Sequence, residues 1–209
     1  MLLKTFAAIL ATALIVPHDH LTDLNIGDKA PMLDHPMADV SGDTITLKDL
    51  AGEKGLLVIF TSNTCPFVIG SEGSEGWDGR YAEIHHLTIG MNVGMALINS
   101  NHTTRDKGES MQAMQARHKE HNYGARYLLD ENSTVANAYA ARTTPHVFLF
   151  NKDMELVYKG AIDDSVASAK EVKEPWLKNA LNALNAGKPI EPATTRNIGC
   201  SIKRPAHAH

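Results

Sequence analysis

The sequence predicts an α/β domain in which helices flank a central mixed sheet. Two apolar runs, at residues 56–60 and 93–99, carry most of this prediction, because neither shows the regular polar alternation of a half-buried strand. Such runs are typical of strands that are covered on both faces. Segments with helical character separate the predicted strands, and a strand pair over 146–150 and 155–159 closes the domain. This alternation indicates a sheet with helices on both faces.

The other elements follow from turn residues and short periodic segments. Alternating residues on either side of Gly42 predict a β-hairpin over residues 37–47, and one helical turn is expected over 47–50. The glycines between residues 70 and 79 predict a loop, because each glycine inside a helix costs about 1 kcal/mol relative to alanine. A helix near 80–87 is expected after this loop. Further along we expect a helix over 107–121, a short strand over 127–129, a helix over 133–141 capped near Asn132 or Ser133, and a final helix over 174–186.

Composition and charge exclude several classes of protein. The chain has 209 residues, of which 43% are hydrophobic, so it is too apolar for intrinsic disorder. The formal net charge of -4 argues against a nucleic-acid or anionic-membrane partner, because such partners need a basic surface. Two cysteines are too few for a disulfide scaffold or a cysteine-rich zinc module.

Neither a metal site nor a cofactor is expected. Eleven histidines are present, but no histidine pair has a third ligand at metal-binding spacing. The glycines between residues 70 and 79 lack the Gly-Lys-Ser/Thr ending of a phosphate-binding loop. Any sulfur chemistry must therefore come from Cys65, from Cys200 or from both.

The N-terminus predicts an export signal. Lys4 supplies a short positive region, and the apolar run that follows is too short to span a bilayer. A buried N-terminal helix is the alternative. We expect a signal peptide over 1–17, a domain over 18–187 and a C-terminal tail over 188–209 that carries Cys200. The mature protein is then periplasmic or secreted, with no stable membrane insertion after signal cleavage, in a compartment where disulfides persist.

Cys65 is the main candidate for chemistry because it follows a buried strand and directly precedes Pro66. Proline is favoured at the first position of a helix, so Cys65 is expected at a helix start. This edge of an open α/β sheet is where ligands bind, and the helix dipole with its free N–H groups can stabilise a thiolate there. The alternative is an inert buried cysteine.

A second feature, Thr144-Pro145 directly before the strand at 146–150, makes the pattern more specific. A Cys-Pro helix start followed later by a Thr-Pro strand start resembles the thioredoxin-like superfamily. The leading hairpin and the closing strand pair look like its redoxin branch, which includes alkyl hydroperoxide reductases and thiol-specific antioxidant proteins, over about residues 25–187. Segments at 159–164 and 199–203 look like an exported bacterial group of redoxin-domain proteins.

The resemblance implies a thioredoxin-like fold with an N-terminal β-hairpin extension. It also implies a cis-proline at Pro145, whose loop packs against the active cysteine, and a substrate-binding surface formed by Thr144, Pro145 and Pro66.

The chain departs from the best-known members of this superfamily. Thioredoxin uses Cys-x-x-Cys, but the second cysteine position is Val68 here. A peroxiredoxin uses Pro-x-x-x-Thr-x-x-Cys; Ser62 keeps the hydroxyl of that pattern, whereas Val58 replaces its proline. The thiolate-stabilising arginine of the peroxiredoxins falls about where Pro145 stands. The peroxidase pocket is therefore not reproduced residue by residue.

These observations predict a redoxin-type thiol–disulfide oxidoreductase. Cys65 is the expected nucleophile, Ser62, Thr64 and the first-turn amides are expected to stabilise its thiolate, and Cys200 is the candidate resolving cysteine. The partners would be a thiol or disulfide protein, or a small hydroperoxide, together with an unknown thiol electron donor. Two alternatives stay open: a non-catalytic redoxin-fold module that binds a protein and has a structural Cys65–Cys200 disulfide, and a thiol peroxidase.

Two further sites have both functional and ordinary interpretations. His146, beside the predicted cis-proline, could tune Cys65 or shape the substrate groove, or could be an ordinary strand residue. Asp163 and Asp164 could form a buried proton acceptor for thiol exchange, or could belong to a turn or a helix cap.

Overall fold

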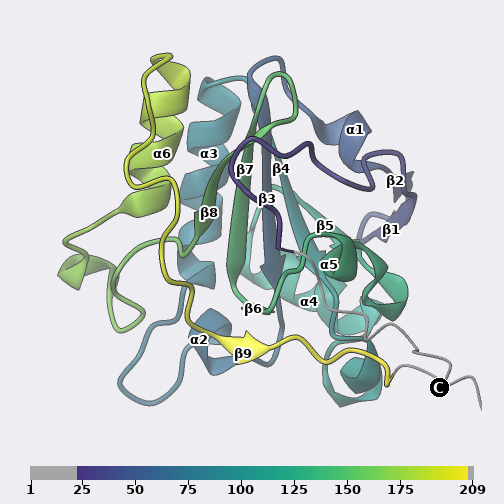
Figure 1. The fold of residues 1–209 in the computed structure, drawn as a ribbon. Coiled ribbons are helices and arrows are strands. Elements are labelled where there is room, and N and C mark those ends of the chain that lie inside the picture. Colours follow the sequence, from purple (N-terminus) through teal and green to yellow (C-terminus); the bar gives the residue numbers. More distant parts are fainter. Residues whose placement is uncertain (1–22, 207–209) are drawn as a thin grey trace, which may run out of the picture.

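A seven-stranded mixed sheet runs through the centre of the molecule (Figure 1). The structure is a computed structural model and describes residues 23–206. Strand order in the sheet is β2-β1-β5-β4-β3-β7-β8. These strands are β1 (Met37–Asp39), β2 (Thr44–Ile45), β3 (Gly55–Thr61), β4 (Val93–Asn99), β5 (Arg126–Leu129), β7 (His146–Asn151) and β8 (Leu156–Gly160). A separate two-stranded sheet pairs β6 (Thr143–Thr144) with β9 (Cys200–Ser201).

β3 lies between β4 and β7 in the sheet, and all seven of its residues are buried. It pairs in parallel with β4, and β4 pairs in parallel with β5. The remaining ladders of the large sheet are antiparallel, including the β1–β2 hairpin and the long pairing of β3 with β7. Because helices cover both faces at β3, this strand needs apolar residues on both sides. The predicted fold class, a central mixed sheet flanked by helices with an N-terminal β-hairpin extension, is confirmed.

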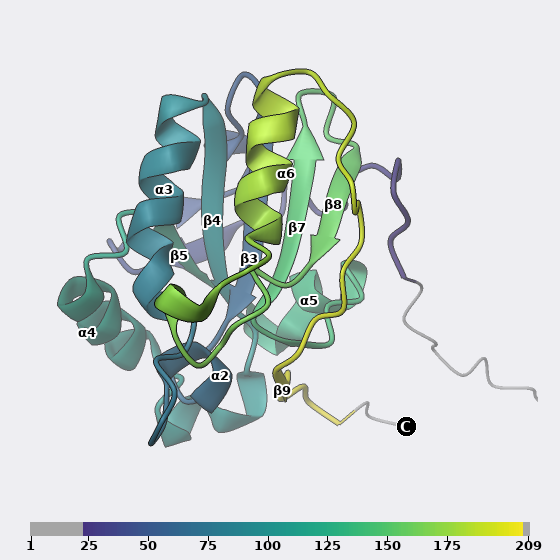
Figure 2. The ribbon, with the colours of Figure 1, turned by 90° about the vertical axis from the view of Figure 1, so that its left-hand side faces the viewer.

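Helices cover both faces of the sheet. They are α1 (Leu47–Leu50), α2 (Pro66–Ile69), α3 (Tyr81–Gly90), α4 (Met111–His121), α5 (Thr134–Ala138) and α6 (Trp176–Asn185), with 3-10 turns at Asp78–Arg80, His102–Lys107, Glu131–Ser133 and Ala169–Glu171. α3 and α6 lie side by side on one face (Figure 2), whereas α1 and α5 pack on the other. Within the described residues, no helix is both long enough and apolar enough to cross a membrane.

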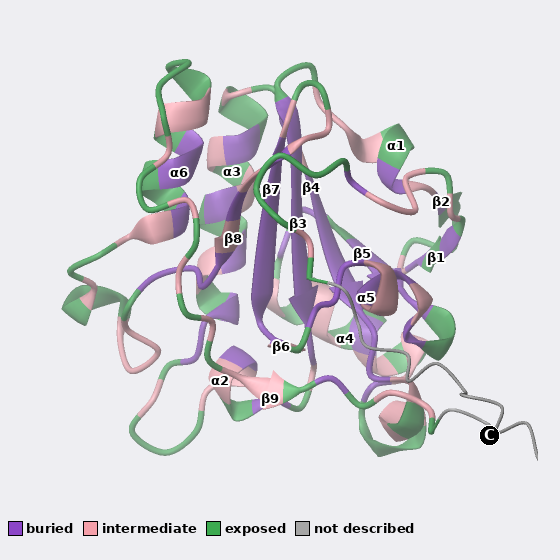
Figure 3. Cartoon of the chain, viewed as in Figure 1, coloured by how far each residue is buried: buried purple, intermediate pink, exposed green. Residues whose placement is uncertain are grey.

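Each face of the sheet carries a hydrophobic core, because successive side chains of a strand point to opposite faces. Leu57 and Ile59 pack in the core under α3 and α6, which also contains Cys65. Val58 and Phe60 pack in the opposite core. Figure 3 shows the result: the central strands are buried along their length, and exposed residues gather on the outer sides of helices and on loops.

Helix α4 begins later than the sequence pattern predicts. Gly108 has a left-handed backbone with φ of 97°, which ends the preceding turn. Ser110 then caps the helix, because its hydroxyl oxygen accepts a hydrogen bond from the N–H of Ala113 at 3.2 Å. Met111 is consequently the first residue of α4, and the residues before it are free to face the interior.

The helix predicted over 133–141 is shorter in the structure, and its N-cap residue, Ser133, makes no capping hydrogen bond through its side chain. The carboxylate of Asp130 accepts a hydrogen bond from the backbone N–H of Val135 at 3.0 Å. Asp130 therefore supplies the side-chain hydrogen bond that the sequence pattern predicts from Asn132 or Ser133. An acceptor five residues before the amide that it caps is outside the spacing of an ordinary N-cap.

The C-terminal tail docks against the domain (Figures 1 and 2). The backbone N–H of Lys159 donates to the carbonyl oxygen of Ala193 at 3.0 Å, and the N–H of Ile202 donates to that of Arg142 at 3.1 Å. The Ile202 side chain is 5% exposed and packs in the same core as Phe60. The segment beyond α6 therefore contributes to the folded core.

His146 opens β7 and lies on the same face as Phe148, which is opposite to the face where Cys65 packs. Its Nδ1 accepts a hydrogen bond from the backbone N–H of Arg142 at 3.3 Å, and its ring packs on Phe148 with 4.5 Å between the centroids. Burial, with added repulsion from Lys159, lowers the pKa of the imidazole to about 4. His146 is thus a neutral strand residue and does not contact the sulfur.

Replacing His146 by glutamine is expected to reduce the loss of stability in acid. The imidazole of the unfolded chain binds a proton near its ordinary pKa of 6.5, whereas the folded protein keeps it neutral until about pH 4. Acidification between these values therefore favours unfolding, and wild type should lose about 2 kcal/mol more than His146→Gln between roughly pH 7 and pH 4.5. Urea unfolding at both pH values measures this, with the exposed His86→Gln as control. Identical pH dependence in wild type and His146→Gln would contradict it.

Shortening Ile202 to alanine is expected to lower the free energy of unfolding by about 2–4 kcal/mol, because it empties part of a packed core. Ile198→Ala in the same tail is the matched control, since that side chain is 45% exposed and its loss should change stability by less than about 0.5 kcal/mol. Urea unfolding of both variants makes the comparison. Equally small effects would mean that the tail does not unfold together with the domain.

Candidate functional site

Cys65 lies at the start of the single-turn helix α2, in the short loop that follows β3. Its backbone is extended, and Pro66 takes the first helical position, where a backbone N–H has no partner inside the helix. The carbonyl oxygen of Cys65 accepts from the N–H of Val68 at 2.8 Å. The Cys65 side chain is 3% exposed, and its Sγ donates to the carbonyl oxygen of Thr144 at 3.1 Å. The thiol is therefore buried and held against the segment before β7.

Ser62 and Thr64 lie beside Cys65, but their hydroxyl groups donate to Glu109. Both hydroxyls reach Glu109 Oε1, that of Thr64 at 2.7 Å. Ser62 Oγ also accepts from the backbone N–H groups of Thr64 and Cys65, each at 3.1 Å. The two residues therefore hold the loop in shape, in place of the predicted contact with the sulfur.

Glu109 is a fully buried carboxylate at the centre of this network. Its Oε2 accepts from the backbone N–H of Asn63 at 2.9 Å and from Asn99 Nδ2 at 2.5 Å. Donors thus converge on both oxygens, as burial of a carboxylate requires. Arg105 Nη1 donates to the backbone carbonyl of Glu109 at 3.0 Å and to Asn99 Oδ1 at 2.6 Å. The end of β4 and the turn before α4 are thereby tied to the cysteine loop.

The Thr144–Pro145 segment brings the second cysteine to the site. Its peptide bond is cis. The strand β9 pairs antiparallel with β6, so that Cys200 stands opposite Thr144, the residue whose carbonyl oxygen binds the Cys65 thiol. Gly199 passes so close that a Cβ at this residue would overlap the same carbonyl oxygen. Two cysteines far apart in the sequence therefore meet at one backbone group.

Cys200 is half-buried beside Cys65, and both are free thiols in the structure. Burial and the neighbouring Cys65 thiol raise the pKa of Cys200 to about 11, while the backbone N–H of Phe67 and the charge of Lys203 act in the opposite direction. A thiol with such a pKa is protonated at neutral pH. Cys200 is therefore poorly suited to make the first attack on a substrate.

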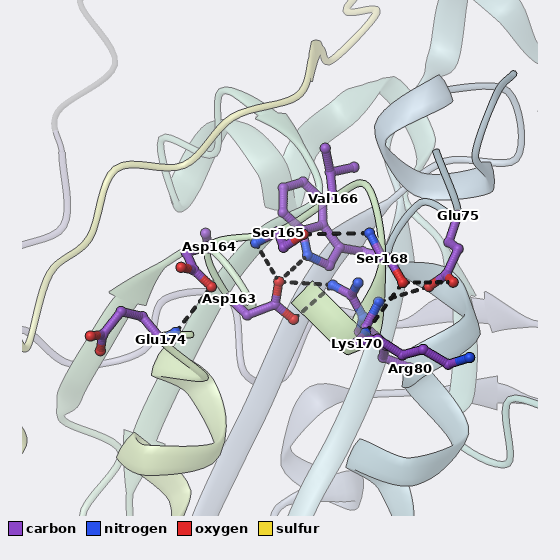
Figure 4. A network of polar contacts seen from close by, with 12 residues as sticks. Glu75, Arg80, Asp163, Asp164, Ser165, Val166, Ser168, Lys170 and Glu174 are labelled. Carbon is purple, nitrogen blue, oxygen red and sulfur yellow. Dashed lines mark hydrogen bonds and ion pairs between the residues drawn. The ribbon is translucent and has the colours of Figure 1, made fainter. Parts of the chain in front are cut away.

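Polar contacts join the glycine-rich segment after α2 to the segment between β8 and α6 (Figure 4). Asp163 forms an ion pair with Arg80 at 2.7 Å, in which both side chains are largely buried, and accepts a hydrogen bond from Trp77 Nε1 at 2.8 Å. Asp164 accepts from the backbone N–H of Glu174 at 3.0 Å. Asp164 thus fits the turn-capping interpretation, and Asp163 is engaged in linking the two segments.

A groove lies beside the cysteine loop, where these two joined segments meet helix α2. Its lining is Pro66, Phe67, Ser71, Ser74 and Val166. Pro66, which the resemblance places in a substrate-binding surface, therefore borders an open and partly apolar groove. Among residues 23–206, no group of three or more His, Cys, Asp or Glu side chains is arranged to hold a metal ion.

Three residues of this network were not predicted from the sequence: Glu109, Asn99 and Arg105. Asn99 carried a usable signal, because it ends a buried strand at the same edge of the sheet as the cysteine loop. Glu109 carried none. It falls inside a predicted helix, where most glutamates are exposed. Only the later start of α4 allows it to turn inward.

The sequence model of the Redoxin family matches residues 25–173. A solved structure of an uncharacterized conserved protein from Geobacillus kaustophilus is similar to this chain, with 29% identity, a TM-score of 0.79, and 88% of this chain and 95% of that chain covered. A hypothetical protein from Sinorhizobium meliloti 1021 has 31% identity and a TM-score of 0.78, with 88% and 97% covered. The search of curated proteins gave no match.

More distant neighbours share the fold alone. One is a secreted Mycobacterium tuberculosis disulfide oxidoreductase homologous to E. coli DsbE, with 16% identity and a TM-score of 0.52, covering 72% of this chain and 96% of that chain. These neighbours agree with a thioredoxin-like fold. Because the family model matches residues 25–173, which is more than half of the chain, the chain belongs to the redoxin family.

Proposed function

We propose that this chain is an exported thiol–disulfide oxidoreductase of the redoxin type, with Cys65 as nucleophile and Cys200 as resolving cysteine. One observation carries the proposal. The chain has two cysteines, and β9 sets Cys200 opposite the residue whose carbonyl oxygen binds the Cys65 thiol. Export rests on the signal predicted over 1–17, which lies outside the described residues.

The proposed reaction is thiol–disulfide exchange in two steps. The Cys65 thiolate attacks one sulfur of a substrate disulfide, which forms a mixed disulfide and releases the other substrate sulfur as a thiolate that takes up a proton. Cys200 then loses its proton and attacks Cys65 Sγ. The second substrate sulfur leaves, and a Cys65–Cys200 disulfide remains. The substrate has gained two electrons, which an external thiol donor must return to the pair.

Glu109 acts in this reaction as a positioning residue. Through Ser62 and Thr64 it holds the turn that presents Cys65, and through Asn63 it holds the start of that turn. A fixed turn keeps the sulfur aligned with an incoming disulfide. Reactions are accelerated when the reacting groups are held in the correct geometry.

The docked tail also supports a second candidate, a non-catalytic redoxin-fold module with a structural Cys65–Cys200 disulfide that binds a protein partner. Burial of Ile202 already holds the tail in place, and a permanent bond would pin it there. The reduction potential separates the two candidates, because structural disulfides usually have potentials below about -300 mV.

A thiol peroxidase has less support from the geometry. The hydroxyl of Ser62, which the peroxiredoxin pattern would use for peroxide, donates to Glu109. Arg142 stands near the position of the thiolate-stabilising arginine of that family, but it pairs with Asp23 at 3.0 Å. A fast second-order reaction of Cys65 with peroxide would favour this candidate in spite of these contacts.

Changing Cys65 to serine is expected to abolish the acceleration that the protein gives to the reduction of a disulfide-bonded test protein by dithiothreitol, because Cys200, the remaining thiol, is poorly suited to the first attack. Cys200→Ser is the matched control. It keeps the nucleophile and should accumulate a mixed disulfide, which mass spectrometry detects. Equal activity of wild type and Cys65→Ser would falsify the proposal.

Changing Glu109 to glutamine is expected to slow the reaction of Cys65 with a small aromatic disulfide by about tenfold, and to lower the free energy of unfolding by about 2–3 kcal/mol, because the new NH2 group faces other donors. Stopped-flow rates are measured at a temperature where both proteins are folded. Glu131→Gln is the control, since that side chain is 62% exposed. A variant that loses stability but reacts at the wild-type rate would show that Glu109 has no positioning role.

A further inference from the structure

The strand β9 covers the backbone edge of β6 that faces the thiol of Cys65. Thr144 binds Cys65 Sγ through its carbonyl oxygen, and the chain's own tail pairs with Thr144 in an antiparallel ladder. With β9 in place the Cys65 side chain is 3% exposed. A second polypeptide cannot pair with β6 at this position until β9 leaves.

The residue before Cys200 is restricted by the same ladder. Gly199 runs so close to β6 that a Cβ would overlap the carbonyl oxygen, and also the carbonyl carbon, of Thr144. The obstacle is backbone on the sheet side, which cannot rotate away as a flexible side chain would. Its φ is not in the left-handed region, so the restriction comes from space and not from backbone conformation. A strand in this register therefore needs glycine directly before its cysteine.

The residue two positions after Cys200 supplies the other restriction. Ile202 is 5% exposed and packs in the core, while Ser201 between them is exposed. The backbone N–H of Lys203 then donates to Asn101 Oδ1 at 3.0 Å. The docked segment, residues 199–202, thus consists of a glycine, a cysteine, an exposed residue and a buried aliphatic residue, in that order.

We propose that residues 199–202 are a tethered pseudo-substrate, and that the true substrate is an extended protein segment with the pattern Gly-Cys-x-aliphatic that displaces β9 and pairs with β6 in the same register. The inference rests on the proposed function and specifies its substrate class. In the exchange, the Cys65 thiolate attacks the cysteine sulfur of the incoming disulfide, a Cys65–substrate disulfide forms, and the other sulfur leaves as a thiolate. When β9 pairs with β6 again, it displaces the substrate strand and returns Cys200 to the mixed disulfide, which it resolves.

Release of the tail tests the first half of the proposal. In a Cys200→Ser background Cys65 is the single thiol, and its reaction with an aromatic disulfide that releases a coloured thiolate is followed by absorbance. Gly199→Val and, independently, Ile202→Ala should each raise the second-order rate constant by about tenfold, because each loosens β9 by overpacking or by loss of core contacts. Gly90→Val is the matched control, since a Cβ at that glycine meets nothing and its φ is ordinary.

Peptide substrates test the register. The probe is the peptide of residues 197–203, Asn-Ile-Gly-Cys-Ser-Ile-Lys, carried as a mixed disulfide with the coloured thiolate. With the Gly199→Val, Cys200→Ser protein it should react about tenfold faster than the same peptide with valine in place of glycine, because only glycine fits beside Thr144. A third peptide, with alanine in place of the isoleucine that corresponds to Ile202, should also react more slowly. Dithiothreitol should not distinguish the three.

The outcomes separate this inference from the proposed function. Unchanged rates in both tail variants, or equal rates for the glycine and valine peptides, overturn the pseudo-substrate while Cys65 remains a reactive nucleophile. If Cys65 of the released protein reacts no faster than the same thiol in the urea-unfolded chain, and Cys65→Ser leaves disulfide reduction unchanged, the oxidoreductase itself is excluded.

Discussion

The site depends on one backbone group, the carbonyl oxygen of Thr144, and on the sheet pairing that delivers it. β3 and β7 are antiparallel neighbours whose ladder ends with Phe60 opposite His146. The loop after β3 and the segment before β7 therefore emerge side by side, and Cys65 meets Thr144 at 3.1 Å. The apolar residues that bury these two strands thus also set the environment of the thiol. Because the tail pairs with the same segment, the positions of both cysteines follow from the pairing of β6 with β9 and of β3 with β7.

The polar network beside the loop holds a tight turn in place at the end of a buried strand. Turns there leave backbone N–H groups that need acceptors. A surface turn would use water, but this one uses the carboxylate of Glu109 and the hydroxyl of Ser62. Inside a protein such a network is strong when every member is bonded and destabilising when one is missing. The loop around Cys65 is therefore held in place by buried and part-buried hydrogen bonds.

Much of the fold could be predicted, because several of its elements are determined by interactions between residues close together in the sequence. Continuous apolar runs identify β3 and β4, and Cys65-Pro66 marks a helix start, because strand burial and proline geometry act over a few residues. Glu109 could not be predicted, since its burial depends on where α4 begins and on partners from two other elements. The pairing of Cys200 with Thr144 was equally inaccessible: two cysteines suggest a pair, but the ladder that joins β6 to β9 is a contact between distant parts of the chain.

Val68 occupies the place where thioredoxin has its second cysteine, and its side chain is completely buried. Because a core residue fills that place, a partner sulfur for Cys65 would come from the tail, and the ring closed on oxidation would be larger. A Cys-x-x-Cys bond closes a ring of four residues, whereas a Cys65–Cys200 bond would enclose most of the chain and restrict the unfolded state by up to ~4–5 kcal/mol in the chain-entropy model. Redox state would then govern melting temperature and resistance to proteolysis, so that reduced molecules are degraded before oxidised ones.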